Sequence, residues 1–264
     1  MGVLEALILG LVQGLTEFLP ISSSGHLELG AFFLNVQTKD NLLFAIVVHG
    51  ATALSTIVVF RKTIARLVLD LFKFQWNEGT IYVLKLAISM IPVMIVGLLF
   101  EDTINDFFGG KVIFVAFMLI VTGLLLISTT LIKPKDGDIT YGKSILIGIA
   151  QTIAILPGIS RSGATISTAL ISGVDKNKAT QFSFLMVLAP IIGASLLKVK
   201  AFIEQPEIAS DISATALVVG FAAAFGSGLF ACSWMVKIVR KGKLGYFAIY
   251  CFVVAAIVLI KYWT

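Results

Sequence analysis

The chain has 264 residues, of which 58% are hydrophobic and 13% are charged. A soluble domain carries about 25% charged residues, so this composition excludes an ordinary soluble protein. It predicts an all-α polytopic membrane protein that forms a single integral membrane domain, 1–264. The formal net charge is +5. Because cytoplasmic loops of membrane proteins collect Lys and Arg anyway, we expect membrane lipids and no nucleic acid as partners.

Two apolar regions, 3–34 and 144–172, are interrupted in the middle by Pro, Ser and Gly. The pieces of the first are about 17 and 10 residues long and those of the second about 13 and 10, so the short pieces reach only halfway through a ~30 Å hydrocarbon core. Pro20 and Pro157 disfavour helix in the residue before them. Irregular backbone is tolerated at membrane depth only where it lines a protein cavity. We therefore predict two re-entrant helix pairs that meet near the midplane.

The remaining apolar runs are near the ~20 residues that a helix needs to cross a bilayer. They predict about six full transmembrane helices, over 42–60, 81–100, 112–132, 177–199, 212–236 and 244–262.

The charges of the connecting segments predict how the chain is threaded. Basic segments are expected in the cytoplasm, and 61–85, 133–143 and 237–243 are basic. The acidic segments 101–111 and 200–211 are expected outside. The first helix pair then enters from the outside and the second from the inside.

Each half of the chain thus contains one re-entrant pair and three full spans. An odd number of crossings inverts the second repeat, 144–262, relative to the first, 1–132, and the cytoplasmic loop 133–143 joins them. Inverted repeats place a site near the midplane, at the interface between the repeats. Helix N-termini at the two breaks would offer amide groups and positive dipole ends there, which suits an anion.

The two interruptions carry related motifs. The first is Gln13-Gly-Leu-Thr-Glu17-Phe-Leu-Pro20-Ile-Ser22-Ser23-Ser24-Gly25-His26, and the second is Gln151-Thr-Ile-Ala-Ile-Leu-Pro157-Gly158-Ile-Ser160-Arg161-Ser162-Gly163-Ala-Thr165. A shift of 138 positions superposes Gly10 on Gly148, Gln13 on Gln151, Ser22 on Ser160, Ser24 on Ser162 and Gly25 on Gly163. The prolines do not superpose, because Pro157 lies one position before the counterpart of Pro20.

Glu17 is expected at membrane depth, where an ionised carboxylate costs ~2.5 kcal/mol or more unless it is paired. One interpretation is a hydrogen-bonded packing residue. The other is a ligand for a hard divalent cation, Mg²⁺ or Ca²⁺, because such ions prefer carboxylate and amide oxygens. Gln13 lies four residues earlier on the same helix face, where it would supply a second oxygen or orient a water.

Three serines, Ser22, Ser23 and Ser24, precede a short helix that is expected to begin near Gly25, and one of them is expected to be its N-cap. His26 follows Ser23 by three residues, so both side chains can approach one locus. A histidine can act as general acid or base, and an adjacent base is what a serine needs to become a nucleophile.

Arg161 is the sharpest single signal, because arginine in the bilayer core is expensive and is rarely kept without a partner. Its planar donor fork suits phosphate oxygens. The same phosphate is expected to be bound by Ser22, Ser24, Ser160, Ser162, Gly163 and Thr165, which would line the pocket around Arg161. The alternative interpretation is an Arg161–Glu17 ion pair that holds the repeats together, and it is compatible with the first. His49, inside the run 42–60, is expected to form a helix–helix hydrogen bond.

With these residues in view, the chain resembles the undecaprenyl-diphosphatase family, bacterial membrane enzymes linked to bacitracin resistance. The resemblance covers essentially the whole length and rests on the two motifs, both long and rich in unusual polar residues. It implies hydrolysis of undecaprenyl diphosphate to undecaprenyl phosphate and inorganic phosphate, which recycles the lipid carrier of peptidoglycan synthesis. It also implies a divalent metal and a multi-pass location in the bacterial inner membrane, with the site opening to the outer, periplasmic face.

The resemblance also implies roles for single residues. Glu17 corresponds to the metal-associated acid, Ser23 to the proposed nucleophile, His26 to the catalytic histidine and Arg161 to the phosphate-binding arginine. Position 13 is glutamate in some members, and Gln13 removes one negative charge. That change should weaken metal attraction or shift it onto Glu17 and the phosphates of the substrate.

A rival function is a transporter or lipid flippase, because inverted repeats with broken helices are usual in secondary transporters. The Ser23/His26 pair favours an enzyme, since transport needs no nucleophile. A combined role in hydrolysis and lipid return, and a homodimeric assembly, stay open. A purely structural scaffold does not explain ionisable residues in both breaks. For the enzyme, covalent attack by Ser23 and direct attack by water both stay open.

Overall fold

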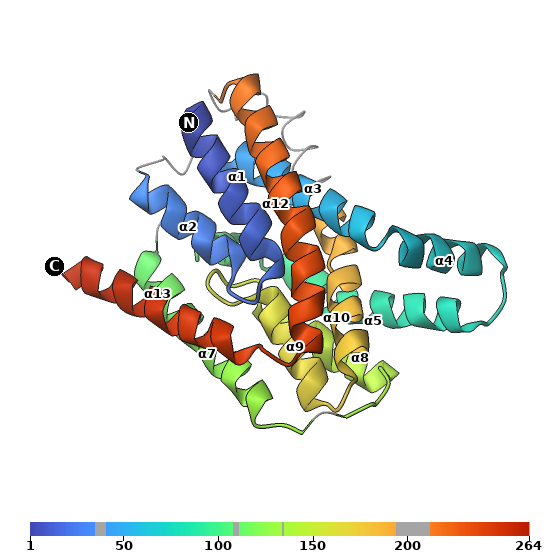
Figure 1. The fold of residues 1–264 in the computed structure, drawn as a ribbon. Coiled ribbons are helices and arrows are strands. Elements are labelled where there is room, and N and C mark those ends of the chain that lie inside the picture. Colours follow the sequence, from blue (N-terminus) through green and yellow to red (C-terminus); the bar gives the residue numbers. More distant parts are fainter. Residues whose placement is uncertain (35–40, 108–110, 134, 194–211, 264) are drawn as a thin grey trace.

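The computed structural model describes residues 1–34, 41–107, 111–133, 135–193 and 212–263. In these ranges the chain folds into α-helices (Figure 1). They are α1 (Val3–Phe18), α2 (Ser23–Phe33), α3 (Asn41–Val59), α4 (Arg61–Phe72), α5 (Glu78–Leu99), α6 (Glu101–Asn105), α7 (Val112–Thr130), α8 (Tyr141–Ile153), α9 (Arg161–Ile171), α10 (Lys176–Met186), α12 (Ala214–Arg240) and α13 (Gly245–Trp263).

Four of the described helices, α5, α7, α12 and α13, are long and apolar enough to cross a membrane. A fifth candidate is α3, which continues into α4 through a bend of 78°. The chain is therefore an all-α, multi-pass membrane protein, as its composition predicted.

The predicted span 177–199 is wrong as a single helix. Helix α10 ends at Met186, Val187 forms a turn, and helix resumes at 188–193. The cause is Pro190, because a proline ring clashes with the carbonyl of the residue four positions earlier, here Met186. The rest of the predicted span, 194–199, and the predicted acidic loop 200–211 lie outside the described residues.

The basic segment 61–85 contains a helix that the charge pattern did not predict. Helix α4 follows the bend after α3, and it lies antiparallel to the first part of α5 in a hairpin that projects from one side of the molecule (Figure 1). Its Ile64 and Leu67 belong to a hydrophobic cluster that includes Leu86 of α5. Apolar residues at helical spacing within a charged stretch explain why this segment folds as an amphipathic helix.

The predicted interruptions are confirmed as helix breaks. Helix α1 ends at Phe18 and α2 begins at Ser23, while α8 ends at Ile153 and α9 begins at Arg161. The shift of 138 positions places α2 on residues 161–171, which are the bounds of α9. The first break covers residues 19–22 and the second 154–160. The second break is three residues longer, because α8 ends at Ile153, three residues before position 156, the counterpart of Phe18.

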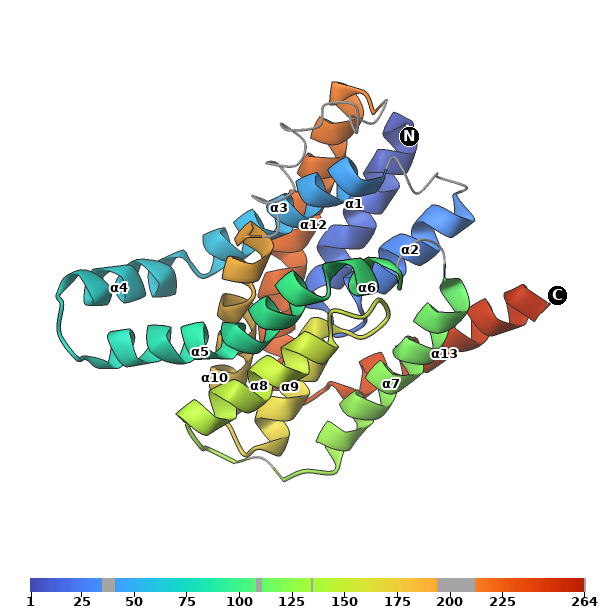
Figure 2. The same ribbon diagram turned by 180° about the vertical axis from the view of Figure 1, so that it is seen from behind.

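Helices from the two repeats exchange partners. Helix α1 packs most extensively on α12, and its counterpart α8 packs on α5, the counterpart of α12. Helices α7 and α13, counterparts of each other, also pack together (Figures 1 and 2). Reciprocal pairing of this kind is what a twofold relation between repeats produces. The inverted orientation of the second repeat stays a prediction.

Glycines allow these reciprocal helix pairs to approach closely. A Cβ at Gly10 of α1 would lie 2.5 Å from the carbonyl oxygen of Gly220 on α12. A Cβ at Gly148 of α8, its counterpart, would overlap the carbonyl oxygen of Ser89 on α5. Lipid tails are as apolar as leucine, so helix association in a membrane depends on close packing and interhelical hydrogen bonds rather than on hydrophobic burial.

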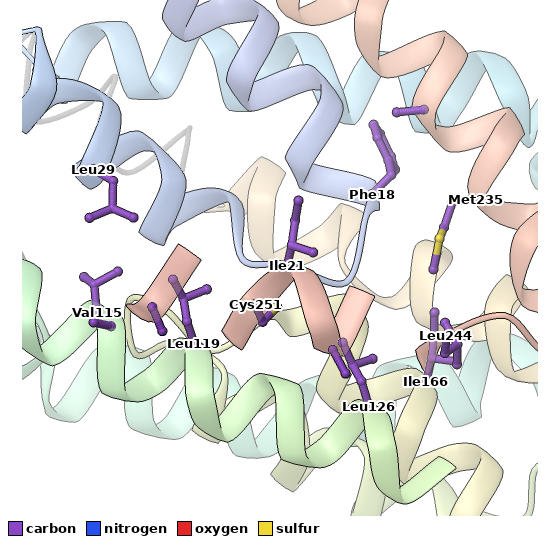
Figure 3. Close-up of a cluster of buried hydrophobic side chains, with 14 of the residues drawn as sticks. Phe18, Ile21, Leu29, Val115, Leu119, Leu126, Ile166, Met235, Leu244 and Cys251 are labelled. Carbon is purple, nitrogen blue, oxygen red and sulfur yellow. The ribbon is translucent and has the colours of Figure 1, made fainter. Parts of the chain in front are cut away.

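An apolar cluster supports the first break. Phe18 and Ile21 lie on either side of Pro20, and both are nearly fully buried. Figure 3 shows Ile21 on the side of Leu119 of α7 and Cys251 of α13, and all of these residues belong with Phe18 to one hydrophobic cluster. The break is thus anchored on the paired helices α7 and α13.

We predict that Gly148→Ala destabilises the protein by about 1–3 kcal/mol, because the added methyl meets backbone rather than a flexible side chain. Gly97→Ala is the matched control, since a Cβ there meets no atom within 4 Å in the described structure. It should be neutral or stabilising, by up to about 1 kcal/mol, because alanine is the better helix former. Thermal unfolding in detergent compares the two. Equal effects of both substitutions would contradict the packing described.

Candidate active site

The two helix breaks meet at Ser22. Its Oγ accepts hydrogen bonds from the amide of Gly25 at 3.3 Å, which caps α2, and from the amide of Gly158 in the second break at 3.1 Å. Ser22 has a φ of 70°, a left-handed conformation that non-glycine residues adopt rarely. Among the three serines, Ser22 is therefore the N-cap that the sequence led us to expect. Through the Gly158 amide, Ser22 also links the two repeats.

The second break is held by the same kind of interaction. Gly158 has a φ of 98°, and a Cβ there would lie 2.5 Å from the carbonyl oxygen of Val115 on α7. Thr122 of α7 donates to the Gly158 carbonyl at 2.9 Å and accepts from the Ser160 amide at 3.0 Å. The Ser160 side chain caps α9 through the Gly163 amide at 3.1 Å. Backbone groups freed by the break are thus satisfied within the protein, as membrane depth requires.

Glu17 joins the breaks electrostatically. Its Oε2 accepts hydrogen bonds from Gln13 Nε2 at 2.9 Å and from Ser23 Oγ at 2.6 Å. Its Oε1 accepts from Nη2 of Arg161, which forms an ion pair across the two repeats. Glu17 is 6% exposed. A carboxylate at that depth is tolerable because three donors surround it.

The predicted pairing of Ser23 with His26 is wrong in its geometry. The Ser23 hydroxyl donates to Glu17, and both nitrogens of the His26 ring have other partners. Nδ1 lies 2.8 Å from the Ser22 carbonyl oxygen and therefore donates, so in the neutral ring Nε2 accepts from the Tyr250 hydroxyl at 2.9 Å. The His26 and Tyr250 rings are also stacked. The base that lies next to Ser23 is thus Glu17.

A pocket of about 220 Å³ lies where the breaks meet. Its polar lining comes from Thr16, Glu17, Ser22, Ser23, Ser24, His49, Gln151, Ser160 and Arg161. Its apolar lining comes from Val93, Ala154, Ile155, Ile159, Val187, Pro190 and Ile191. The pocket therefore offers polar groups to a charged ligand and apolar side chains to a hydrocarbon chain.

Several residues expected at the site lie behind the pocket lining. Gln13 is fully buried behind Glu17. Ser162 donates to the carbonyl of Leu19 at 3.2 Å and so links the breaks, and Gly163 belongs to the α9 cap. Thr165 was expected to line the pocket, and this is wrong, because its hydroxyl is bonded to Ser183 of α10. Position 165 lies one turn after Arg161 but faces the neighbouring helix.

Sequence reasoning missed three kinds of lining residue. His49 was expected to bond another helix, but its Nδ1 bonds the Ala45 carbonyl of its own helix at 2.8 Å and the residue lines the pocket. Gln151 was recognised as the counterpart of Gln13 but was given no role. The segment after α10 contributes Val187, Pro190 and Ile191, a placement that depends on the helix break at Val187.

Comparison with known proteins assigns this chain to a family. The family model described as "Bacitracin resistance protein BacA" matches residues 6–257. The chain belongs to this family. The family resemblance expected from the two motifs is thereby confirmed.

Relatives in the family match this chain over nearly their full length. A protein named undecaprenyl-diphosphatase from Christiangramia forsetii is 50% identical over 262 residues, which is 98% of each chain. A protein of the same name from Parabacteroides distasonis is 51% identical over 94% of this chain and 93% of its own. Another from Bacteroides thetaiotaomicron is 49% identical over 97% and 98%.

The donors for a metal in this BacA-family site are few. Among the described residues, no group of three or more His, Cys, Asp or Glu lies close enough together to hold a metal ion. Glu17 offers one carboxylate, and the Oε1 of Gln13 beside it has no hydrogen-bond partner in the described part of the chain. Mg²⁺ is commonly held by one or two carboxylates together with substrate phosphates. This donor set fits a metal that protein and substrate hold jointly.

The ion pair predicts non-additive effects on stability. Arg161→Met should cost about 3–5 kcal/mol, because it leaves the Glu17 carboxylate buried without its cation. The double variant Glu17→Gln/Arg161→Met should recover most of that loss, because no uncompensated charge remains. Unfolding of Glu17→Gln, Arg161→Met and the double variant in detergent gives the three changes in stability. The difference between the double-variant change and the sum of the two single changes is the coupling energy of the pair. Additive losses would show that the pair contributes no coupling.

Proposed function

We propose that this chain hydrolyses undecaprenyl diphosphate to undecaprenyl phosphate and inorganic phosphate, and so recycles the lipid carrier of peptidoglycan synthesis and gives bacitracin resistance. The observation that carries the proposal is the contact of 2.6 Å between Ser23 Oγ and Glu17 Oε2, beside Arg161 in the pocket. A nucleophile, a base and an anion-binding cation therefore share one site. Relatives that match over nearly their whole length are named for this activity.

In the first step, Ser23 Oγ attacks the terminal phosphorus while its proton passes to Glu17. The bond between that phosphorus and the bridging oxygen breaks, and undecaprenyl phosphate leaves with the electron pair. Arg161 and the helix N-termini of α2 and α9 stabilise the charge on the phosphate oxygens. In phosphoryl transfer, such positioning and electrostatic stabilisation supply most of the catalysis.

In the second step, water attacks the phosphorus of the phosphoserine. The bond between phosphorus and Ser23 Oγ breaks, and Glu17 returns its proton to the serine oxygen. The protons of the attacking water leave with the inorganic phosphate or pass to solvent. The alternative is direct attack of water on the diphosphate, with Ser23 as a hydrogen-bond donor only. In either route His26 acts as a positioning residue, because it holds the Ser22 carbonyl and thereby the strained start of α2.

A divalent cation, Mg²⁺ or Ca²⁺, is part of the proposal. Glu17 and Gln13 would hold it together with the substrate, and it would supply further neutralisation of phosphate charge. The neutral Gln13 makes the carboxylate of Glu17 and the phosphates the main charged ligands.

The proposed location is the bacterial inner membrane, with the pocket opening to the periplasmic face. The excess of Lys and Arg in the predicted loops 61–85 and 237–243 supports this orientation. The diphosphate would lie between the breaks and the polyprenyl tail along the apolar lining. A transporter with the same architecture would need an anion site but no base bonded to a serine, so the Ser23–Glu17 contact favours the enzyme.

We predict that purified protein releases phosphate from undecaprenyl diphosphate and that Ser23→Ala lowers kcat by about 10³-fold or more, because the nucleophile is lost. Ser128→Ala is the control, since its hydroxyl bonds the Leu125 carbonyl within α7, away from the pocket. Near-normal turnover by Ser23→Ala would exclude the covalent route and leave direct water attack. No release by folded wild-type protein under several metals would refute the phosphatase and make the transporter the working hypothesis.

Removal of divalent metal should abolish phosphate release. EDTA is expected to lower the rate to background, because the phosphate groups then lack their counter-ion. Added Mg²⁺ or Ca²⁺ is expected to restore the rate. The measurement is the rate against free metal concentration, with Glu17→Gln beside the wild type. Phosphate release that persists in EDTA would contradict the requirement for a divalent cation. It would not contradict the proposed attack by Ser23 with Glu17 as base.

A further inference from the structure

The second repeat places an amide in the pocket that the steps above do not use. Gln151 lies on α8, two residues before the helix ends, lines the pocket and is 3% exposed. Neither Nε2 nor Oε1 of its side chain has a hydrogen-bond partner among the described residues. Buried polar groups nearly always have partners. A buried amide that lines a binding pocket without one is therefore suited to bind polar atoms of a ligand.

The repeat explains why Gln151 has no side-chain partner of the kind that Gln13 has among the described residues. Its counterpart Gln13 donates to Glu17, four residues further along the same helix, at 2.9 Å. The residue four positions after Gln151 is Ile155, whose side chain has no acceptor. The amide nitrogen of the first repeat is thus occupied by a carboxylate, whereas that of the second repeat has a pocket beside it.

Arg161 provides a second donor of the same kind. Its Nη2 is bonded to Glu17, but its Nη1 is buried and has no partner in the described part of the chain. Both Arg161 and Gln151 line the same pocket. Two N–H groups without partners among the described residues, on side chains that line one pocket, are suited to bind an oxyanion.

We propose that Gln151 Nε2 and Arg161 Nη1 form an oxyanion subsite, in which Gln151 donates to a non-bridging oxygen of the diphosphate. This inference rests on the proposed function, because it takes a diphosphate as the ligand. A neutral amide suits this position, since it adds no charge that would need a counter-ion inside the membrane. The first repeat then supplies the base and the nucleophile, and the second supplies the donors that bind the phosphates.

The test is Gln151→Leu, which keeps much of the side-chain volume and removes both polar atoms. We expect KM for undecaprenyl diphosphate, and the inhibition constant of inorganic diphosphate, to rise about tenfold or more, while kcat changes less than about threefold. Thermal stability in detergent should stay equal or increase, because a buried group without a partner has been removed. A merely structural glutamine would instead lower stability and leave KM unchanged, and that result would overturn the proposal.

Ser167→Ala is the matched control. Ser167 on α9 also has a buried hydroxyl without a partner among the described residues, but it does not line the pocket. Its substitution should leave both KM and the inhibition constant unchanged. An equal rise in both variants would overturn the subsite, because the effect would then not depend on the pocket.

A second variant, Gln151→Glu, keeps the shape and replaces the donor with a carboxylate. KM should rise more than in Gln151→Leu, because a negative charge faces the phosphates. A KM near that of the wild type would overturn the donor role. If wild-type protein released no phosphate, the proposed function would fail. Binding of inorganic diphosphate to wild type and Gln151→Leu would then still test the subsite alone, and equal affinities would overturn it.

Discussion

The ion pair between Glu17 and Arg161 is the interaction on which the rest of the site depends. Neither charge is tolerable at membrane depth alone, and each comes from a different repeat. The carboxylate can be buried only if the second break brings the guanidinium to it, so both breaks have to form together. The same carboxylate accepts the Ser23 hydroxyl at 2.6 Å. Structural and chemical roles are therefore combined in one side chain, and a change at Glu17 affects both.

The breaks are possible because neighbouring helices satisfy the backbone groups that they free. Ser22 accepts from amides in both breaks, and Thr122 of α7 bonds the amide and the carbonyl on either side of Ile159. Close helix approach at Gly10 and Gly148 brings these groups within hydrogen-bond reach. In lipid, where apolar burial does little to drive helix association, such short contacts and internal hydrogen bonds carry much of the specificity of the fold.

Local sequence determined what could be predicted. Proline and serine at the breaks located both interruptions and narrowed the cap of α2 to three serines, and the cost of buried charge identified Glu17 and Arg161. The partner of His26 could not be predicted, because Tyr250 is 224 positions away in sequence. The end of α10 had a local signal in Pro190. The span 177–199 was predicted from hydropathy, which does not detect a helix break inside an apolar run. Helix α4 was not predicted, because the basic residues of the segment 61–85 obscure the helical spacing of its apolar residues. Ile155 stands in the repeat where the first half has Glu17, the partner of Gln13, so the sequence already shows that Gln151 lacks the corresponding carboxylate.

The correspondence between the repeats also has a consequence for the origin of the site. A symmetric dimer of one ancestral half would place identical residues on both sides of its axis. If that half had the sequence of the present first repeat, a second acid would replace Ile155 and a second serine would replace Arg161. Two carboxylates would face each other without a guanidinium, and like charges so placed cannot both stay ionised. Only after duplication and fusion could positions 17 and 155, and 23 and 161, diverge independently. The site seen here, with Glu17 opposite Ile155 and Ser23 opposite Arg161 in the repeat, therefore requires two halves that differ in sequence.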